Sequence, residues 1–111
     1  MVYGLAITET EIITEIGRRL SRSVPAGSQV VLFGSRARGM ASNTSDYDLL
    51  VIEPAVSDSA AESARLRDQL DDLHAPIDVI VVAEDVARRR AVVCGTVVER
   101  ALREGRVLAK T

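Results

Sequence analysis

Apolar residues recur along the chain with two different spacings, and these spacings separate the expected helices from the expected strands. Thr8 and Glu11 have the form of a helix-capping box, and apolar residues then follow at helical intervals. The pattern predicts a helix from about Glu9 to Ser21, ended by the turn-forming residues Pro25 to Gly27.

Short runs of aliphatic and β-branched residues predict the strands. They span Gln29 to Phe33, Asp48 to Glu53 and Ile77 to Val82, and each is bounded on at least one side by glycine or proline. The segment from Ser35 to Ser45 has neither period and is expected to be a loop with a helical turn at its start. The weaker run from Arg106 to Ala109 is expected to add a short edge strand.

A second long helix is expected between the second and third strands. Ser59 and Glu62 repeat the capping-box pattern, and leucines at helical spacing follow them. The prediction is a helix from about Asp58 to Leu73, with the leucines on its buried face.

Two shorter helices are expected near the C-terminus. Glu84 and Asp85 open the first, and apolar residues from Val97 to Leu102 define the second. Gly105 is expected to end the second helix as a C′ glycine. Cys94 falls on the same apolar face and is therefore expected in the core.

The order helix, strand, strand, helix, strand, helix, helix predicts the fold class. It is an α/β (α+β) fold, a small mixed β-sheet with helices packed on it. The helical link favours parallel pairing of the second and third strands through a right-handed crossover. We expect a single domain over residues 1–111.

Composition and charge exclude some classes of function. Apolar residues make up 47% and charged residues 27%, as in an ordinary globular protein. The net charge of −2 argues against an extended basic surface, so direct nucleic-acid binding is not expected. No apolar run has the length of a membrane span, the N-terminus lacks a signal-peptide layout, and Cys94 is the only cysteine. These features predict a cytoplasmic protein without an internal disulfide.

A glycine-containing loop and three aspartates form the candidate site. Gly34 and Ser35 follow the first strand directly. Asp46 and Asp48 stand at the entry of the second strand, and Asp78 lies one residue into the third. Because parallel strands begin at the same edge of a sheet, the three aspartates are expected to meet there. If the first strand is antiparallel to the second, the loop reaches the same edge.

The spacing of the aspartates suits a magnesium site. Residues i and i+2 of a strand face the same side about 6.6 Å apart, so Asp46 and Asp48 can serve one site while Tyr47 packs behind the strand. Mg²⁺ takes oxygen ligands, and two ions about 3.5–4 Å apart can brace an attacking and a leaving oxygen. Three carboxylates that include Asp78 would repel one another without a cation.

The loop supplies the opposite charge. Gly34 permits a tight turn, and Ser35 with the following backbone N–H groups can form an anion-binding nest. Arg36 and Arg38 are expected to neutralise phosphate charge. We therefore predict that the loop binds the triphosphate of a nucleotide.

Two other phosphate-binding motifs are excluded. Gly34 and Gly39 have the Walker A spacing, but Met40 and Ala41 follow where Lys and Ser or Thr are required. The sequence also lacks the GxGxxG fingerprint of dinucleotide-binding folds.

The sequence resembles a known family. Gly34-Ser35, ten further residues and Asp46-x-Asp48, within the segments GSRARG and SDYDLLV, are similar to the minimal nucleotidyltransferase (MNT) domains of the DNA polymerase β-like nucleotidyltransferase superfamily. The opening helix, the strand that carries Asp78 and the closing segment ALREGRVLAK are similar as well, so the resemblance covers nearly the whole chain.

The resemblance implies roles for the site residues. Asp46 and Asp48 would bind both Mg²⁺ ions, and Asp78 would bind the ion that activates the acceptor hydroxyl. Gly34 and Ser35 would hold the β- and γ-phosphates of ATP. The implied fold is the nucleotidyltransferase fold.

The resemblance also implies a partner. MNT proteins of this size commonly pair with a HEPN-domain ribonuclease in a toxin–antitoxin system. This chain would be the antitoxin, type VII-like, and would transfer AMP from ATP to a tyrosine of the HEPN toxin within a hetero-oligomer. Two alternatives stay open: an antitoxin that only masks its partner, and a nucleotidyltransferase that acts on a small molecule.

Overall fold

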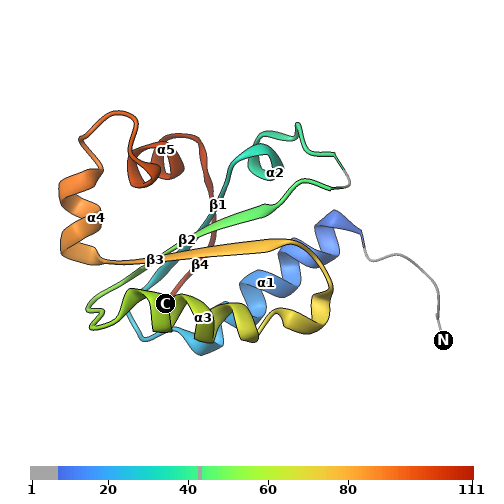
Figure 1. Ribbon diagram of the computed structural model, residues 1–111, viewed down its shortest axis with the longest axis horizontal. Coiled ribbons are helices and arrows are strands. Elements are labelled where there is room, and N and C mark those ends of the chain that lie inside the picture. Colours follow the sequence, from blue (N-terminus) through green and yellow to red (C-terminus); the bar gives the residue numbers. More distant parts are fainter. Residues whose placement is uncertain (1–7, 43) are drawn as a thin grey trace.

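A four-stranded mixed sheet forms the centre of the molecule in the computed structural model, which describes residues 8–42 and 44–111 (Figure 1). The strands β1, β2, β3 and β4 span Gln29–Phe33, Tyr47–Glu53, Ile77–Ala83 and Arg106–Lys110. They lie in the order β3-β2-β1-β4. β1 pairs antiparallel with β2 and β4, and β2 pairs parallel with β3. The predicted mixed sheet, including the edge strand, is confirmed.

Helices cover both faces of this sheet. The helices α1, α2, α3, α4 and α5 span Glu9–Ser23, Ser35–Arg38, Ser59–Asp68, Glu84–Arg90 and Val97–Glu104, and the 3₁₀ helix η1 spans Asp71–Leu73. α1 and α3 pack on one face, and α4 and α5 lie on the other (Figure 1). The capping box that opens α1 is present, because Thr8 Oγ1 accepts from the Glu11 N–H at 3.1 Å.

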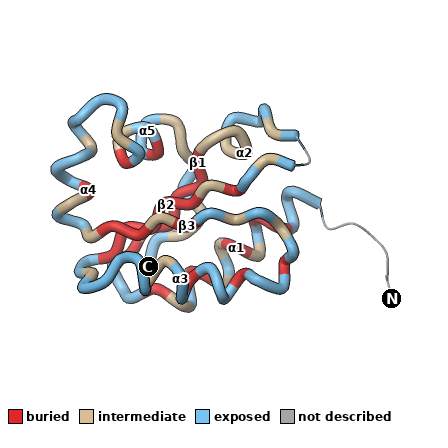
Figure 2. Tube along the Cα trace, viewed as in Figure 1, coloured by how far each residue is buried: buried red, intermediate tan, exposed pale blue. Residues whose placement is uncertain are grey.

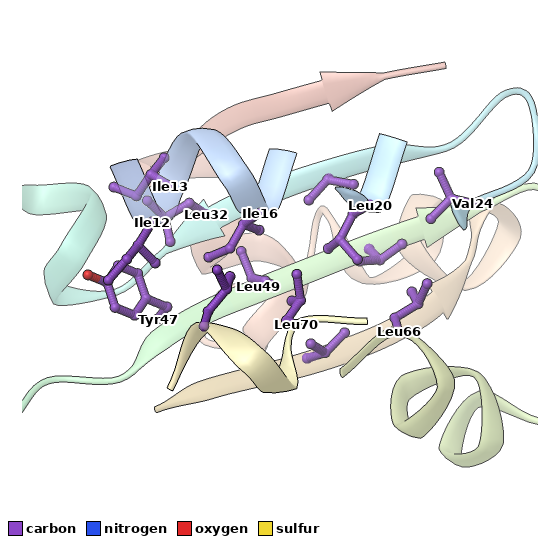
Figure 3. Close-up of a cluster of buried hydrophobic side chains, with 14 of the residues drawn as sticks. Ile12, Ile13, Ile16, Leu20, Val24, Leu32, Tyr47, Leu49, Leu66 and Leu70 are labelled. Carbon is purple, nitrogen blue, oxygen red and sulfur yellow. The ribbon is translucent and has the colours of Figure 1, made fainter. Parts of the chain in front are cut away.

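The core has two parts, one on each face of the sheet. Figure 2 shows that burial concentrates on the strands and on the inner sides of the helices. The larger part lies under α1 and α3, where Ile16, Leu20 and Leu49 are fully buried (Figure 3). The smaller part lies under α4 and α5 and includes Leu50 and Val98. Burial of one such side chain stabilises the fold by about 1.5–3 kcal/mol. Because β1 and β2 are buried on both faces, they give the site described below a rigid support.

The prediction of one helix from Asp58 to Leu73 was wrong. α3 ends at Asp68, and the N–H of Leu70 then donates to the carbonyl of Arg67 at 2.9 Å instead of continuing the α-helical ladder. This tightening of the chain turns Leu70 and Leu73 into the core, where they are 1% and 6% exposed. The leucines meet the core as predicted, but through two short helices.

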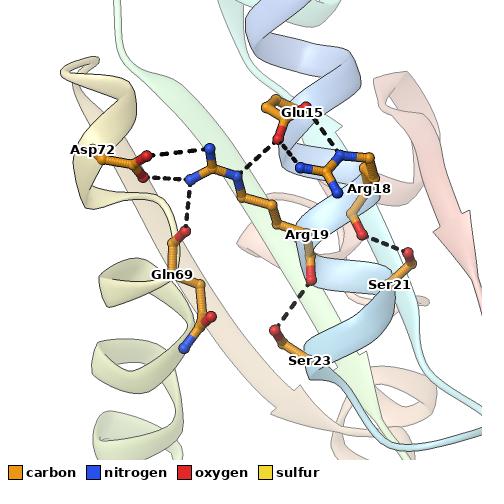
Figure 4. Close-up of polar contacts among 7 residues, drawn as sticks. All are labelled: Glu15, Arg18, Arg19, Ser21, Ser23, Gln69 and Asp72. Atoms are coloured by element: carbon orange, nitrogen blue, oxygen red, sulfur yellow. Dashed lines mark hydrogen bonds and ion pairs between the residues drawn. The ribbon is translucent and has the colours of Figure 1, made fainter.

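A polar network holds α1 against the segment that follows α3. Arg19 on α1 pairs with Glu15 on its own helix and with Asp72 in η1, and it donates to the carbonyl of Gln69 at 3.1 Å (Figure 4). Hydrogen bonds from Arg18 and Arg19 lower the pKa of Glu15 to about 2. The network fixes the approach to β3 relative to α1.

Two details of the C-terminal half differ from the prediction. Cys94 is exposed in the connection between α4 and α5, because α5 begins only at Val97 and the connection does not continue its buried face. Gly105 does end α5, but with an extended backbone (φ −84°) rather than a left-handed one. A Cβ there would overlap the carbonyl oxygen of Ala101 and lie 2.6 Å from Cγ1 of Val31, so both the end of α5 and its close approach to β1 favour glycine.

Within the described residues, no helix is long and apolar enough to cross a membrane.

Candidate active site

The strand register brings the predicted site residues to one edge of the sheet. Asp48 on β2 lies opposite Phe33, the last residue of β1, and beside Asp78 on β3. Gly34 follows Phe33 directly, and Asp46 directly precedes β2. The loop and the three aspartates therefore come from neighbouring chain segments at the same end of three adjacent strands (Figure 1).

The site opens on the sheet face that carries α4 and α5. Asp48 alternates with Tyr47, which is 2% exposed and packs in the core on the α1 face, as predicted. Leu50, two residues after Asp48, belongs to the core under α4 and α5. Asp48 is half-buried, whereas Asp46 and Asp78 are exposed. Asp48 is thus the floor of the site, and the other two carboxylates lie nearer to solvent.

The acidic groups of the site act on one another. The pKa of Asp48 is raised, first by burial and then by the negative charges of Asp46 and Asp78. The positive charges of Arg100 and Arg38 oppose this effect. Burial and the neighbouring negative charges therefore disfavour the ionised form of Asp48, and a bound cation would stabilise it.

Gly34 is required at this position for two reasons. Its φ is +76° and its ψ −160°, a conformation that residues with a Cβ rarely adopt. A Cβ on Gly34 would also overlap the Oδ2 atom of Asp48. The turn after β1 therefore lies directly against the carboxylate, which would have to shift to admit a Cβ.

The residues after Gly34 form the short helix α2. The carbonyl of Gly34 accepts from the N–H groups of Ala37 and Arg38, and Ser35 is the first helical residue. Ser35 and its N–H therefore stand at the positive end of the turn, beside the aspartates. Arg38, at the other end, pairs with Glu104 of α5 at 2.9 Å and remains partly exposed.

Arg36 lies on the other face of the sheet. It pairs with Glu9 at 2.9 Å, donates to the carbonyl of Ser45 at 2.8 and 3.1 Å, and stacks over Tyr47 at 4.2 Å. Its side chain is 8% exposed. These contacts give Arg36 a structural role in holding the loop before β2, and its predicted contact with phosphate stays without support.

One cationic residue at the site was missed by the sequence reasoning. Arg100 on α5 acts on Asp48, and it lies four residues before Glu104, hence on the same side of that helix. The sequence signal for Arg100 was its spacing of four residues from Glu104. This spacing puts both side chains on the same side of α5, which faces the loop when α5 lies over β1.

The side chains of the site are of the type that binds Mg²⁺, but they do not surround a common point in this structure. Asp46, Asp48 and Asp78 offer the oxygen ligands that Mg²⁺ prefers. In the part of the chain that the structure describes, no three acidic, histidine or cysteine side chains surround a common point. Asp46 and Asp78 are exposed, so packing does not fix their rotamers.

Comparison with known sequences identifies the class of protein. The sequence pattern of the nucleotidyltransferase domain family matches residues 13–108, which include every site residue named above. The chain belongs to this family, and its class of activity is nucleotidyl transfer. No curated protein matches the chain.

Solved structures carry the same fold. A toxin–antitoxin complex with AMP-PNP is 21% identical with a TM-score of 0.60, covering 95% of this chain and 75% of that one. A complex of a tri-AMPylated Shewanella oneidensis HEPN toxin with its MNT antitoxin is 18% identical with a TM-score of 0.60, covering 94% and 74%. A Sulfolobus solfataricus protein described as a nucleotidyltransferase is 25% identical with a TM-score of 0.53, covering 78% and 84%. The nucleotidyltransferase fold is therefore confirmed.

Proposed function

We propose that this chain is a magnesium-dependent adenylyltransferase of the cytoplasm, a single MNT domain over residues 1–111. It transfers AMP from ATP to a hydroxyl group, most simply a tyrosine, of a HEPN-domain toxin and thereby acts as an antitoxin. The observation that supports this most directly is the register that sets Asp48 beside Asp78 and against Gly34.

The site residues divide the work. Asp46, Asp48 and Asp78 would hold two Mg²⁺ ions, which neutralise phosphate charge and activate the acceptor hydroxyl when bound. Ser35 and the N–H groups at the start of α2 would bind the β- and γ-phosphates, with Gly34 letting the backbone approach them. In-line attack of the hydroxyl on the α-phosphate would then release pyrophosphate, with positioning and charge neutralisation supplying most of the rate.

Two arginines would assist this step. Arg38 and Arg100 approach the carboxylates from α2 and α5, on the face that remains open. Guanidinium groups at that position would bind the departing pyrophosphate and keep it in line with the reacting bond. Arg36 has no part in this assignment, because its donors are engaged on the opposite face.

The choice of a protein acceptor rests on the structural relatives. One of them contains a HEPN toxin that carries three AMP groups, in complex with an MNT antitoxin. Another contains a toxin–antitoxin pair with AMP-PNP. The same fold covers about 95% of this chain in that complex, which supports a hetero-oligomer with a HEPN partner here.

Mass spectrometry of the partner tests the proposal. The chain is incubated with ATP, Mg²⁺ and a HEPN-domain toxin as partner, and the partner is expected to gain the mass of one or more AMP groups. D46N and D48N are each expected to abolish the gain, by at least about a thousandfold in rate. D85N, an exposed change on α4, is the matched control and is expected to leave it unchanged.

Two outcomes contradict the proposal. If D46N and D48N modify the partner normally, the carboxylates do not carry the chemistry. If the variant D46N/D48N/D78N rescues cells from the toxin as well as the natural chain does, the protein acts by masking its partner alone.

A further inference from the structure

An apolar cavity lies beside the candidate active site, on the same face of the sheet. Ile80 and Val82 follow Asp78 on β3 at intervals of two residues, so their side chains share its face, and Ile80 lies about 6.6 Å along the strand from it. The two apolar residues line a cavity of about 240 Å³, here called the β3 groove. The groove therefore begins where the carboxylates of the candidate site end.

The connection from α4 to α5 forms a wall of the β3 groove. It runs from Arg90 to Thr96, and both residues line the groove, as does Val97 at the start of α5 (Figure 1). The hydroxyl of Thr96 donates to the carbonyl of Arg90 at 3.0 Å, and its N–H donates to the carbonyl of Val93 at 3.3 Å. These hydrogen bonds hold the two ends of the connection together.

This wall leaves apolar side chains in solvent. Val92 is 85% exposed, Val93 51% and Val97 36%. Figure 2 shows the connection between α4 and α5 as an exposed stretch of the chain. Single exposed apolar residues are common, but a group of them around an apolar cavity marks an interaction surface. The β3 groove therefore suits an apolar group of a partner molecule.

One cation at the groove lacks a counter-charge among the described residues. Arg88 on α4 pairs with Glu84 at 2.6 Å. Arg89 pairs with Asp85 at 3.3 Å. Arg90, the next residue, is exposed and lines the groove, and no acidic side chain in residues 8–42 and 44–111 forms an ion pair with it. An acidic side chain of a partner would complement this charge.

The geometry of in-line transfer puts the acceptor on this side of the site. The strands lie in the order β3-β2-β1, with Gly34 directly after β1 and Asp78 on β3. With the triphosphate against the turn at Gly34, as proposed above, pyrophosphate leaves on the β1 side. The attacking hydroxyl must approach the α-phosphate from the opposite side, because the attacking and leaving oxygens lie in line. That side is the side of β3 and its groove.

We infer that the β3 groove is the docking surface for the protein acceptor, an inference that rests on the proposed function. A large apolar side chain of the acceptor enters between β3 and the start of α5, and an acidic residue beside it pairs with Arg90. A second cavity of about 390 Å³ shares Ile80, Val82 and Arg90 with the groove and extends it to Val86. An elongated apolar surface of this kind fits a polypeptide segment better than a small polar acceptor does.

Steady-state AMP transfer to a HEPN-domain toxin tests the apolar contact. V97D puts a charge on the groove wall at the first residue of α5, where an acidic side chain favours the helix. It is expected to raise KM for the toxin at least about tenfold and to leave kcat unchanged. V107D is the matched control, because Val107 is 48% exposed on β4, at the other edge of the sheet, and it is expected to keep the natural KM. The melting temperature of each variant and its Kd for AMP-PNP with Mg²⁺ verify the fold and the nucleotide site.

Charge reversal tests the acidic group of the acceptor. R90E is expected to raise KM for the toxin at least about fivefold, and to remove most of the rise in KM that about 0.5 M NaCl causes in the natural chain. R88E makes the same change in net charge on the same helix and is expected to behave as the natural chain does, since Arg88 has its own partner in Glu84.

Three results would overturn the inference. They are equal KM values for V97D and V107D, equal KM values for R90E and R88E, and a kcat/KM for N-acetyltyrosinamide that matches the value for the toxin. Any of these leaves the proposed function standing if D48N still abolishes transfer. If the natural chain transfers no AMP, the proposed function fails, and toxin binding measured by calorimetry decides on the groove. Weaker binding by V97D than by V107D would then support the groove, and equal binding would overturn it.

Discussion

Asp48 is the residue around which the candidate active site is organised. On β2 it lies opposite Phe33 of β1 on one side and Asp78 of β3 on the other. This pairing brings the turn at Gly34 and the residue Asp78 next to it. Its surroundings raise its pKa, first through burial. Asp48 therefore lies against the turn at Gly34, and the charges of Asp46, Asp78, Arg38 and Arg100 all act on its pKa.

The contact of Gly34 with Asp48 gives a prediction about one methyl group. G34A is expected to lower the rate of AMP transfer at least about tenfold. It is also expected to destabilise the fold by more than the roughly 1 kcal/mol that an alanine forced to positive φ usually costs. The reason is that the new Cβ would overlap Asp48 Oδ2. Gly39 provides the control, because its φ is +73° and nothing lies within 4 Å of its Cβ position. If G39A impairs transfer and stability as much as G34A does, the close approach is irrelevant.

The raised pKa of Glu53 predicts how stability depends on pH. Burial and the neighbouring Glu62 raise the pKa to about 7 in the folded chain from near 4.5 ordinarily, so between these values the folded form keeps a proton that the unfolded form releases. Raising the pH through this window therefore destabilises the fold, by about 2–3 kcal/mol. E53Q is expected to lack this loss in urea unfolding at pH 5 and pH 8. An identical loss in E53Q would show that the proton is held elsewhere.

Residue types alone could not separate Arg36 from Arg38. Both follow Gly34 in the loop, and both were predicted to bind phosphate. The short helix α2 turns them to different sides, so that Arg36 reaches Glu9 and Ser45 on the α1 face while Arg38 reaches Glu104 on the α5 face. The direction of a side chain in a loop depends on backbone angles that a pattern of residues does not specify.

At the scale of elements, α5 is the helix that borders the site. It lies over β1, and its residues Arg100 and Glu104 reach toward Asp48 and Arg38. The approach of helix to strand is set by Gly105, where a Cβ would lie 2.6 Å from Val31 Cγ1 and 2.9 Å from the carbonyl oxygen of Leu32. The position of Arg100 and Glu104 therefore depends on a glycine outside the site.

G105A is expected to destabilise the fold by about 1–3 kcal/mol in urea unfolding, because it forces an added methyl group between α5 and β1. The added Cβ would overlap the backbone carbonyl oxygen of Ala101 in α5 as well as Cγ1 of Val31, so the effect measures crowding against both the helix and the strand. G95A serves for comparison, since nothing lies within 4 Å of its Cβ position and only its φ of +90° resists the change. A cost for G105A below that for G95A would mean that α5 can move away from the sheet freely.

Element boundaries followed from local signals where those signals were strong. The capping box at Thr8 and the apolar runs of β1 to β3 predicted helix and strands within two residues of their observed ends. The break after Asp68 had no glycine or proline to mark it. Leu70 and Leu73, in the turn and the 3₁₀ helix that follow the break, are both buried, so the end of α3 goes with the packing of the core and not with a local sequence signal.

At the scale of the whole molecule, the sheet carries acidic residues at its two opposite ends. The aspartates stand where β2 and β3 begin, and Glu53 stands where β2 ends. The convergence of the aspartates could be predicted from strand order, since parallel pairing puts strand starts together. The cavity that Glu53 lines together with Glu62 and Arg65 of α3 could not be predicted from the sequence, because it depends on how α3 returns across the sheet.

The proposed activity requires Asp46, Asp48 and Asp78 to bind the same magnesium ions, and a crystal structure with Mg²⁺ and AMP-PNP will show whether they do. We predict that oxygens of all three carboxylates lie about 2.0–2.1 Å from one or both magnesium ions, with the triphosphate against the turn at Gly34. A structure in which the ions bind away from these residues, or in which Asp78 points away from both, would contradict it.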